Sequence, residues 1–497
     1  MSDQQAQAVV TDDLPSIGRR AGRGLRWTLT GNLVLKVGSF ALSLAMVRLL
    51  APHDFGLYAV ALAANAFLIH VNDVGLIAAT VQWRGDVDEM AATARTMAIT
   101  FSVGWYALFW VGAPILADAA GSPDAAPLIR LLTLVIVLDG VTAVSVGVIQ
   151  RRFQQDKLMK AIAVGFVCCA VVNLTLAVAG AGAYSFVIGS LVQAVVVAIL
   201  VLRAARMPFR LGLDRAVARR LLVFGIPLAA GLGVESVVLY SDSVIVGHVL
   251  GTVALGFYLL AFNISSWVPG MVGAAVRYVS IPAFSRLAEG ESETFTLGVQ
   301  RALPMLLTFV APVAAVMVTL SPALIHVLYG EHWVPAAEAL RFLAFVMVAR
   351  MFTALVFDIQ TGLGNTKVTV GLNLVWLVAL LPALWIGAHH GIRGAAIGHA
   401  LVALTVAIPL AGWLLHRAGV HMGPVVRRLV RPVVAAVAAG ATMAAVAHEV
   451  GSPFAQLVLG GGLGMVVYAL VALPRDQRAP ARRWVSSFLA ARRGAQA

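Results

Sequence analysis

Charged side chains in the middle of long apolar stretches are the residues of this sequence best placed to do chemistry. They include the basic residues Lys36, Arg277 and Arg350 and the acidic residues Asp73, Glu235 and Asp242. A charge at the bilayer centre costs about 2.5–3.5 kcal/mol on insertion scales, so each one needs a partner or a water-filled cavity. Because guanidinium and ammonium groups bind phosphate through charge-assisted hydrogen bonds, the basic set is a candidate anion site.

The first apolar segment carries its polar residues on one helical face. Asn32, Lys36, Ser39 and Ser43 recur at spacings of three and four residues, which places Lys36 near mid-membrane. Such a face suits the wall of a hydrated cavity. It equally suits a seam between helices, in which Ser and Asn hydrogen-bond and Lys36 pairs with a carboxylate. Both interpretations stay open.

The acidic residues also allow two roles. Glu235 and Asp242 lie seven residues apart and share a helical face. Since burial favours the neutral carboxyl form, they could carry a proton. They could equally act as counter-ions to Lys36 or Arg277, and Asp73 could pair with a basic residue or cap a turn.

Two basic residues of one later segment compete for a place in such a cavity. Arg341 and Arg350 are nine residues apart, which puts them on opposite faces of a helix. Depth favours Arg350, because Arg341 lies near the predicted outer interface, where a long side chain reaches water.

The elements that position these residues are membrane-spanning helices. Of the 497 residues, 60% are hydrophobic and 12% are charged, and the mean hydropathy is +0.90. This excludes a soluble enzyme with a membrane tail, and the absence of period-2 alternation argues against a β-barrel. We predict an all-α polytopic membrane protein of about fourteen transmembrane helices.

Charge distribution predicts the orientation. A net charge of +13 would suggest nucleic acid for a soluble protein, but here it indicates cytoplasmic loops that contact anionic lipids. Most of the 36 Lys and Arg residues fall on one side of the predicted membrane, with Arg393 in an outer loop. We therefore expect a multi-pass protein of the cytoplasmic membrane with both termini in the cytoplasm, and no nucleic-acid partner.

A short motif occurs twice, 200 residues apart. Residues 49–58 follow the first predicted span and residues 249–258 follow the seventh, with Leu, Gly and Tyr in register. Equal orientation of the copies indicates a parallel repeat of two six-helix lobes plus a C-terminal helix pair. The predicted parts are a cytoplasmic N-terminal segment 1–26, an N-lobe 27–202, a basic cytoplasmic linker 203–220, a C-lobe 221–415, a cytoplasmic loop with two spans 416–473, and a basic cytoplasmic tail 474–497.

The motifs resemble those of a known family. Residues 47–58, with Pro52, Phe55, Gly56 and Tyr58, look like the first-loop signature of Wzx-type bacterial polysaccharide flippases. These belong to the multidrug/oligosaccharidyl-lipid/polysaccharide exporter superfamily. Residues 73–76, 242–247, 282–287 and 329–336 resemble later motifs in the same order, as does 255–258 with Gly256 and Tyr258.

The resemblance implies a function. We expect transfer of a polyprenyl-diphosphate-linked oligosaccharide from the inner to the outer leaflet for polysaccharide biosynthesis, by alternating access. Lys36, Arg277 and Arg350 would form a cationic central cavity between the lobes for the diphosphate. Asp73, Glu235 and Asp242 would serve ion or proton coupling or as counter-ions. The resemblance implies no enzyme activity, cofactor or metal, and as partners the lipid-linked glycan, a polysaccharide polymerase and glycosyltransferases.

Other functions are weighed against this one. A drug or cation exporter of the same superfamily would have an acidic or aromatic cavity. A membrane enzyme of glycan assembly would need catalytic groups on a long outer loop, and the predicted outer loops are short. A purely scaffolding role also stays open, as do the identity of the glycan and the choice between uniport and proton or sodium antiport.

Overall fold

All regular secondary structure in the described part of the chain is helical. The computed structural model describes residues 31–32, 34–72, 76–77, 80, 87–152, 154–267, 269–270, 292–363 and 366–472, and these ranges contain no strand. Eleven helices within them are long and apolar enough to cross a membrane. The prediction of an all-α polytopic membrane protein is confirmed, whereas the count of fourteen spans and the lobe boundaries stay predictions.

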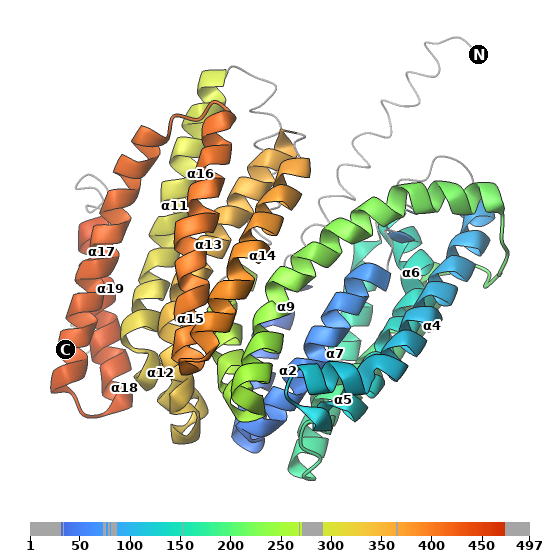
Figure 1. Cartoon of the computed structure of the whole chain (residues 1–497), viewed down its shortest axis with the longest axis horizontal. Helices are drawn as coiled ribbons and strands as arrows, with labels where there is room; N and C mark the ends of the chain where they lie inside the picture. Colours follow the sequence, from blue (N-terminus) through green and yellow to red (C-terminus); the bar gives the residue numbers. More distant parts are fainter. Residues whose placement is uncertain are drawn as a thin grey trace, which may run out of the picture. The chain divides into compact units, whose positions relative to one another are not determined.

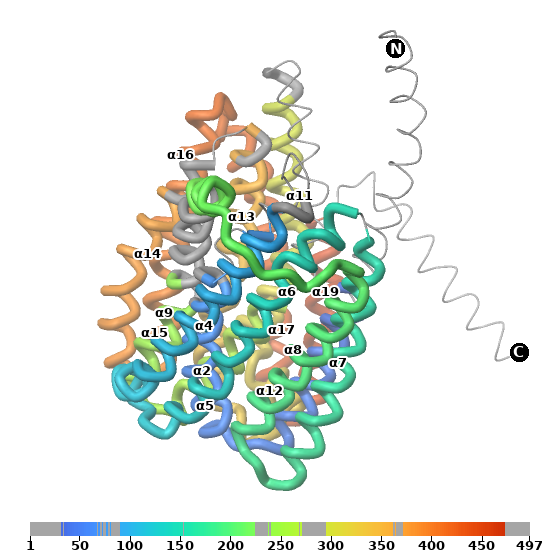
Figure 2. The backbone as a smooth tube through the Cα atoms, turned by 90° about the vertical axis from the view of Figure 1, so that its right-hand side faces the viewer, coloured from blue at the N-terminus to red at the C-terminus, as the bar shows by residue number. Residues whose placement is uncertain are grey.

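The chain divides into two compact units, of which the first comprises residues 1–260 and 373–398. It contains a first helix over 31–32 and 34–49, followed by α2 (Pro52–Asn72), α4 (Val87–Ala119), η1 (Pro123–Ala125), α5 (Ala126–Leu132), α6 (Val135–Arg151), α7 (Gln155–Val178) and α8 (Tyr184–Ala205). Most of α9 (Arg215–Ser265) and of α14 (Thr366–Ala388) also belongs to it. Within this unit α7 packs along α8, and α6 contacts both α4 and α8 (Figure 2).

The second unit comprises residues 261–372 and 399–497. Its helices are α11 (Ser292–Thr319), α12 (Ser321–Tyr329), η2 (Glu331–Ala336), α13 (Ala337–Gly362), the π-helical turn η3 (Ala403–Ala407), α16 (Ile408–Arg417), α17 (Met422–Glu449), α18 (Pro453–Ala455), η4 (Gln456–Gly460) and α19 (Gly461–Ala472). The helix α15 (Gly391–Val402) begins in the first unit and ends in the second. Here α11 packs against α17 and α13, and α17 packs against α19 (Figure 1).

One predicted segment proves to be two helices. The apolar run 302–328 reads as a single span, but α11 ends at Thr319 and α12 starts at Ser321. Pro322 lies in the first turn of α12, where a missing N–H costs nothing. The same Ser-Pro pair starts η1 at Pro123, so in both units the pair marks a helix start that hydropathy alone does not reveal.

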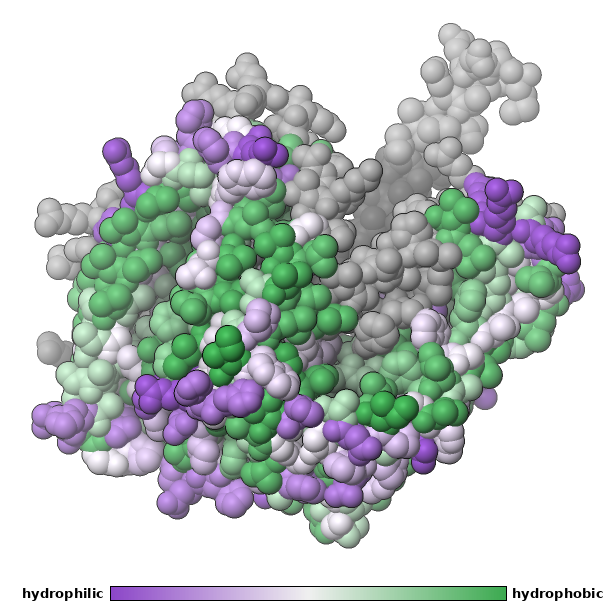
Figure 3. Space-filling view, viewed as in Figure 1, coloured by the Kyte–Doolittle hydropathy of each residue, from purple (hydrophilic) through white to green (hydrophobic). Residues whose placement is uncertain are grey.

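The outer surfaces of the helices are apolar. Val111 and Val178 expose 75% and 74% of their surface, which is costly in water and favourable against lipid chains. In the face shown in Figure 3, a hydrophobic area over the helices is bordered by hydrophilic residues. This pattern agrees with helices that cross a membrane.

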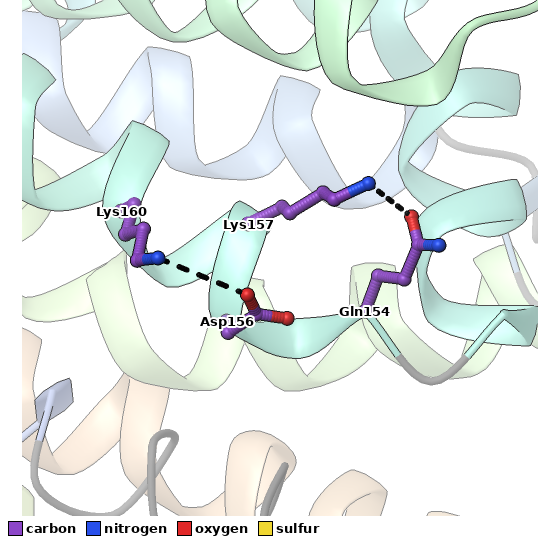
Figure 4. Close-up of polar contacts among 4 residues, drawn as sticks. All are labelled: Gln154, Asp156, Lys157 and Lys160. Atoms are coloured by element: carbon purple, nitrogen blue, oxygen red, sulfur yellow. Dashed lines mark hydrogen bonds and ion pairs between the residues drawn. The ribbon is translucent and has the colours of Figure 1, made fainter. Parts of the chain in front are cut away.

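Several arginines predicted to face the cytoplasm bind the ends of helices. Arg152 Nη1 donates to the Ala205 carbonyl at the end of α8 (2.7 Å), and Arg431 Nε donates to the Val471 carbonyl near the end of α19 (2.8 Å). Cations stabilise helix C-termini, where carbonyl groups lack partners. Beside Arg152, the Lys157–Gln154 hydrogen bond and the Lys160–Asp156 pair lie on the surface (Figure 4).

Candidate functional site

Arg350 is a half-buried guanidinium part-way along α13. Its Nη1 donates to Ser266 Oγ at 3.1 Å, and its Cζ lies 5.4 Å from the centre of the Phe262 ring. The buried His399 of α15 interacts with it electrostatically. The site around Arg350 therefore holds a fixed positive charge beside a buried imidazole ring.

His399 was not among the residues predicted from the sequence. It lies within the apolar run over residues 395–415, so a search for histidine as well as formally charged residues would have found it. The neighbouring turn η3 packs against α13, the helix that carries Arg350. Single π-helical turns within α-helices recur at functional sites, which adds weight to this region.

Lys36 is exposed on the first helix of the first unit. The helix contacts α7 through its glycines. A Cβ added at Gly31 would lie 3.3 Å from Met159 Sδ, and one added at Gly38 would lie 2.8 Å from the Phe166 ring. Lys36 lies two residues before Gly38, which is roughly 160° around the helix. The polar face predicted from the sequence therefore points away from α7.

Asp242 is buried in α9. Its Oδ1 accepts the N–H of Ser243 at 2.8 Å, and its carboxylate interacts with the Tyr258 phenol. Residues 242 and 258 meet because Gly251 interrupts α9 with φ of 81° and the chain reverses there. A positive φ of this size favours glycine. The side chain of Glu235 lies outside the described residues, as do Asp73 and Arg277.

The two copies of the repeated motif pack against each other reciprocally. Gly56 of the first copy faces the main chain of Thr252, and Gly256 of the second faces that of Pro52. An added Cβ at either glycine would overlap the facing carbonyl group, with 2.7 Å to the carbonyl carbon in each case. Residues 52 and 56 correspond to 252 and 256, so the contact is related by an approximate two-fold axis within the first unit.

Side chains of the motif hold this contact in place. Phe55 and Tyr58 both pack on Phe186 of α8. The ring centre of Phe186 lies 5.0 Å from that of Phe55 and 4.5 Å from that of Tyr58. Asp54 Oδ1 accepts the N–H of Ala183 at 3.1 Å. The motif residues predicted from the sequence, Pro52, Phe55, Gly56, Tyr58, Gly256 and Tyr258, thus come together around the two loops.

Further polar contacts join the second copy to the end of α4. The hydroxyl oxygens of Ser122 and Thr252 lie 3.0 Å apart, and His248 Nδ1 lies 2.7 Å from the Ala119 carbonyl oxygen. His248 also stacks on Trp385 at 5.7 Å between ring centres. These contacts surround the reciprocal glycine pair with hydrogen bonds and an aromatic ring.

The family is decided by a match to a family model described as "Polysaccharide biosynthesis protein", which covers residues 45–338. The chain belongs to this family. The succinoglycan biosynthesis transport protein ExoT of Rhizobium meliloti is 26% identical over 474 residues, 91% of this chain and 92% of the relative. The lipopolysaccharide biosynthesis protein WzxC of Escherichia coli is 22% identical over 400 residues, 78% of this chain and 79% of the relative.

Solved structures agree on the fold of this family member. The lipid II flippase MurJ in an inward closed conformation matches with a TM-score of 0.73 at 12% identity, over 90% of this chain and 98% of that one. An inward-facing MATE transporter matches with a TM-score of 0.61 at 18% identity, over 79% and 98%. The family match confirms the resemblance to polysaccharide biosynthesis proteins that the motifs predicted, and these structures show that the fold is shared.

Proposed function

We propose that the protein transfers a polyprenyl-diphosphate-linked oligosaccharide from the inner to the outer leaflet of a bacterial cytoplasmic membrane. Two relatives that align along most of their length carry the names of a succinoglycan transport protein and a lipopolysaccharide biosynthesis protein. The helical membrane fold and the family support transport rather than enzyme chemistry. Both termini would lie in the cytoplasm, where basic loops meet anionic lipids.

The observation that carries the mechanism is the position of Arg350. A guanidinium within an apolar segment of 30 residues, Glu331–Gln360, is expensive unless it meets a partner or water. Its hydrogen bond to Ser266 fixes one nitrogen and orients the planar group. We infer that Arg350, together with Lys36 and Arg277, binds the diphosphate in a cationic cavity, while the lipid tail stays in the bilayer.

The membrane potential favours this direction of transfer. Moving an anion outward across an inside-negative membrane is favourable by about 2.3 kcal/mol per charge per 100 mV. The alternating exposure of the cavity therefore needs no bound nucleotide. Asp73, Glu235 and Asp242 are the candidates for ion or proton coupling or for counter-ions in this cycle.

A leaflet assay tests the function. The purified protein is reconstituted in vesicles with a fluorescent lipid-linked oligosaccharide, and a membrane-impermeant quencher reports the fraction accessible from outside. We expect time-dependent transfer by the wild type and loss of at least tenfold in rate for Arg350→Ala and Lys36→Ala, because a hydrogen bond to a charged group contributes about 1.5–3 kcal/mol. Arg341→Ala, which removes a positive charge of the same helix near the predicted outer interface, is the control.

Each outcome has a separate meaning. No transfer by the wild type, together with efflux of a cationic dye, would favour a drug exporter of the same superfamily. Wild-type transfer that Arg350→Ala and Lys36→Ala both leave unchanged would refute the cationic cavity and keep the flippase function.

A further inference from the structure

The main chain that joins α8 to α9 is fixed to α4. Arg95 of α4 is only 1% exposed, and its Nη1 donates to the carbonyl groups of Pro208 (2.9 Å) and Arg210 (3.3 Å). Its Cζ also lies 4.7 Å from the centre of the Phe209 ring. A buried guanidinium that binds two carbonyl groups of one segment holds that segment at a defined place.

Two threonines of α4 bind main-chain N–H groups further along the same segment. Thr96 Oγ1 accepts the N–H of Gly212 and Thr93 Oγ1 accepts the N–H of Asp214, both at 3.0 Å. A Cβ added at Gly212 would lie 3.4 Å from Ala92, so the side-chain direction at this position faces α4. Position 212 is therefore turned toward the protein, and the main chain of the segment is held against α4.

Three odd-numbered positions of the segment carry large apolar side chains that are more than half exposed. Residues 207–214 adopt no helix, and in extended chain successive side chains alternate between two faces. Phe209, Leu211 and Leu213 expose 55%, 61% and 67% of their surface. Within the described residues this row of three apolar side chains, the 209–213 edge, is more than half exposed, although one side of the Phe209 ring lies against Arg95.

Positive charge surrounds this edge. Exposed arginines lie before, within and after it, at Arg203, Arg206, Arg210, Arg215, Arg219 and Arg220. The acidic residue among them, Asp214, uses its Oδ1 to accept the N–H groups of Ala216 (2.7 Å) and Val217 (3.1 Å) at the start of α9. Its carboxylate serves as a helix cap, and it is the one acidic residue beside six arginines over residues 203–220.

The edge also lies at the depth where membrane helices end. The candidate span Tyr184–Ala205 stops directly before the segment, and the residues of α4 that bind it belong to the first turns of the candidate span Met90–Ala119. Apolar side chains flanked by arginines at the end of membrane spans match the composition of interfacial anchors. The charge and the depth together specify the occupant of this surface.

We propose that the 209–213 edge inserts into the acyl-chain boundary of the inner leaflet and that the flanking arginines bind the headgroups of anionic phospholipids. The fixed backbone presents the three side chains without an ordering cost, because α4 already holds them. This anchor is separate from the transported glycan, and it would tie the α8–α9 connection to the membrane surface.

A single reporter position tests both parts of the proposal. In a background with Cys168 and Cys169 replaced by Ala, Leu211→Cys is labelled with bimane and the protein is placed in nanodiscs. The nanodiscs contain phosphatidylcholine and phosphatidylglycerol, with bromine on the chains of one or the other lipid. We expect quenching by brominated lipid, and roughly fivefold stronger quenching from brominated phosphatidylglycerol at equal mole fraction.

Matched variants separate the two parts. The charge variant Arg215→Gln/Arg219→Gln/Arg220→Gln should remove the preference for phosphatidylglycerol and keep the quenching by phosphatidylcholine. A bimane at Val167, exposed on α7, should show quenching without preference, and one at Asp118 should show little quenching.

Two results would overturn the proposal. Absence of quenching at position 211 by either lipid would show that the edge faces water or a soluble partner protein. Equal quenching by both lipids would refute the assignment of anionic headgroups to the arginine field.

Discussion

The reciprocal packing of the two loops makes Gly56 a sensitive position. A Cβ at Gly56 would lie 2.7 Å from the Thr252 carbonyl carbon, whereas ordinary contact begins at 3.4 Å. The loops must therefore separate by roughly 1 Å, and overpacking of this kind costs about 1–3 kcal/mol. If separation of these loops is the outward-opening step of the proposed transport cycle, Gly56→Ala should shift the equilibrium toward the separated state by about 5- to 150-fold.

A disulfide assay measures this shift. Ser122→Cys and Thr252→Cys, in a background without native cysteines, place two thiols where hydroxyl oxygens now lie 3.0 Å apart. We expect rapid cross-linking of the parent, a lower rate after Gly56→Ala, and an arrest of transport in the cross-linked protein. Gly104→Ala is the control, because a Cβ at Gly104 would meet nothing within 4 Å.

Two results would contradict this reasoning. Equal cross-linking rates for Gly56→Ala and Gly104→Ala would show that the loops absorb the added methyl group without separating. Full transport by the cross-linked protein would show that this contact stays closed throughout the cycle.

Three further changes have defined outcomes. Arg350→Lys should lower the transfer rate about tenfold, which corresponds to a loss of about 1.4 kcal/mol, because only a guanidinium offers planar paired donors. Arg341→Lys should leave the transfer rate within twofold of the wild type. Equal effects of the two variants in the leaflet assay would remove the special role of Arg350. Tyr329 is 3% exposed and its hydroxyl has no hydrogen-bond partner among the described residues, so Tyr329→Phe should leave the free energy of unfolding unchanged or raise it. Burial also raises the pKa of Tyr329 above its ordinary value of 10.0. As the pH rises, the phenol therefore loses its proton in the unfolded protein before it does so in the folded protein. In denaturant titrations above about pH 10 the wild type should lose stability, whereas Tyr329→Phe should keep it. Asp54→Ala removes the acceptor of the Ala183 N–H and should destabilise the protein by about 1–2 kcal/mol in the same titrations. Asp54→Asn should recover part of this stability. An unchanged stability of Asp54→Ala would show that water replaces this contact.

The helical segments could be read from the sequence because the membrane fixes their length. An apolar run must be about 20 residues long to cross the bilayer, and this constraint is local. The apolar run that the sequence shows over 158–180 therefore agrees closely with α7, Gln155–Val178. The helix boundary at Leu320 could not be predicted from hydropathy, because hydropathy stays high through the Ser-Pro helix start that separates α11 from α12.

The candidate site was less accessible to sequence reasoning. The repeated Gly and Tyr positions could be found, but their mutual contact depends on the chain reversing at Gly251 and on residues 200 positions apart. Arg95 was missed because an arginine near the end of a span ordinarily marks an interface, whereas here it is buried under main-chain carbonyl groups. Tertiary packing decides which partner a charged side chain meets. The spacing of polar residues along the first helix therefore predicts the helical face on which Lys36 lies, but not the groups that surround it.

The reciprocal glycine contact has a consequence for how such a chain can arise. The hairpin formed by the first helix and α2 carries both Gly56 and the Pro52 carbonyl group, against which Gly256 of the second copy packs. One hairpin thus displays a surface complementary to itself, which is the property that allows identical subunits to associate about a two-fold axis. Two separate copies of a half-length ancestor could meet through the same backbone surfaces, and fusing their genes would preserve that interface inside a single polypeptide.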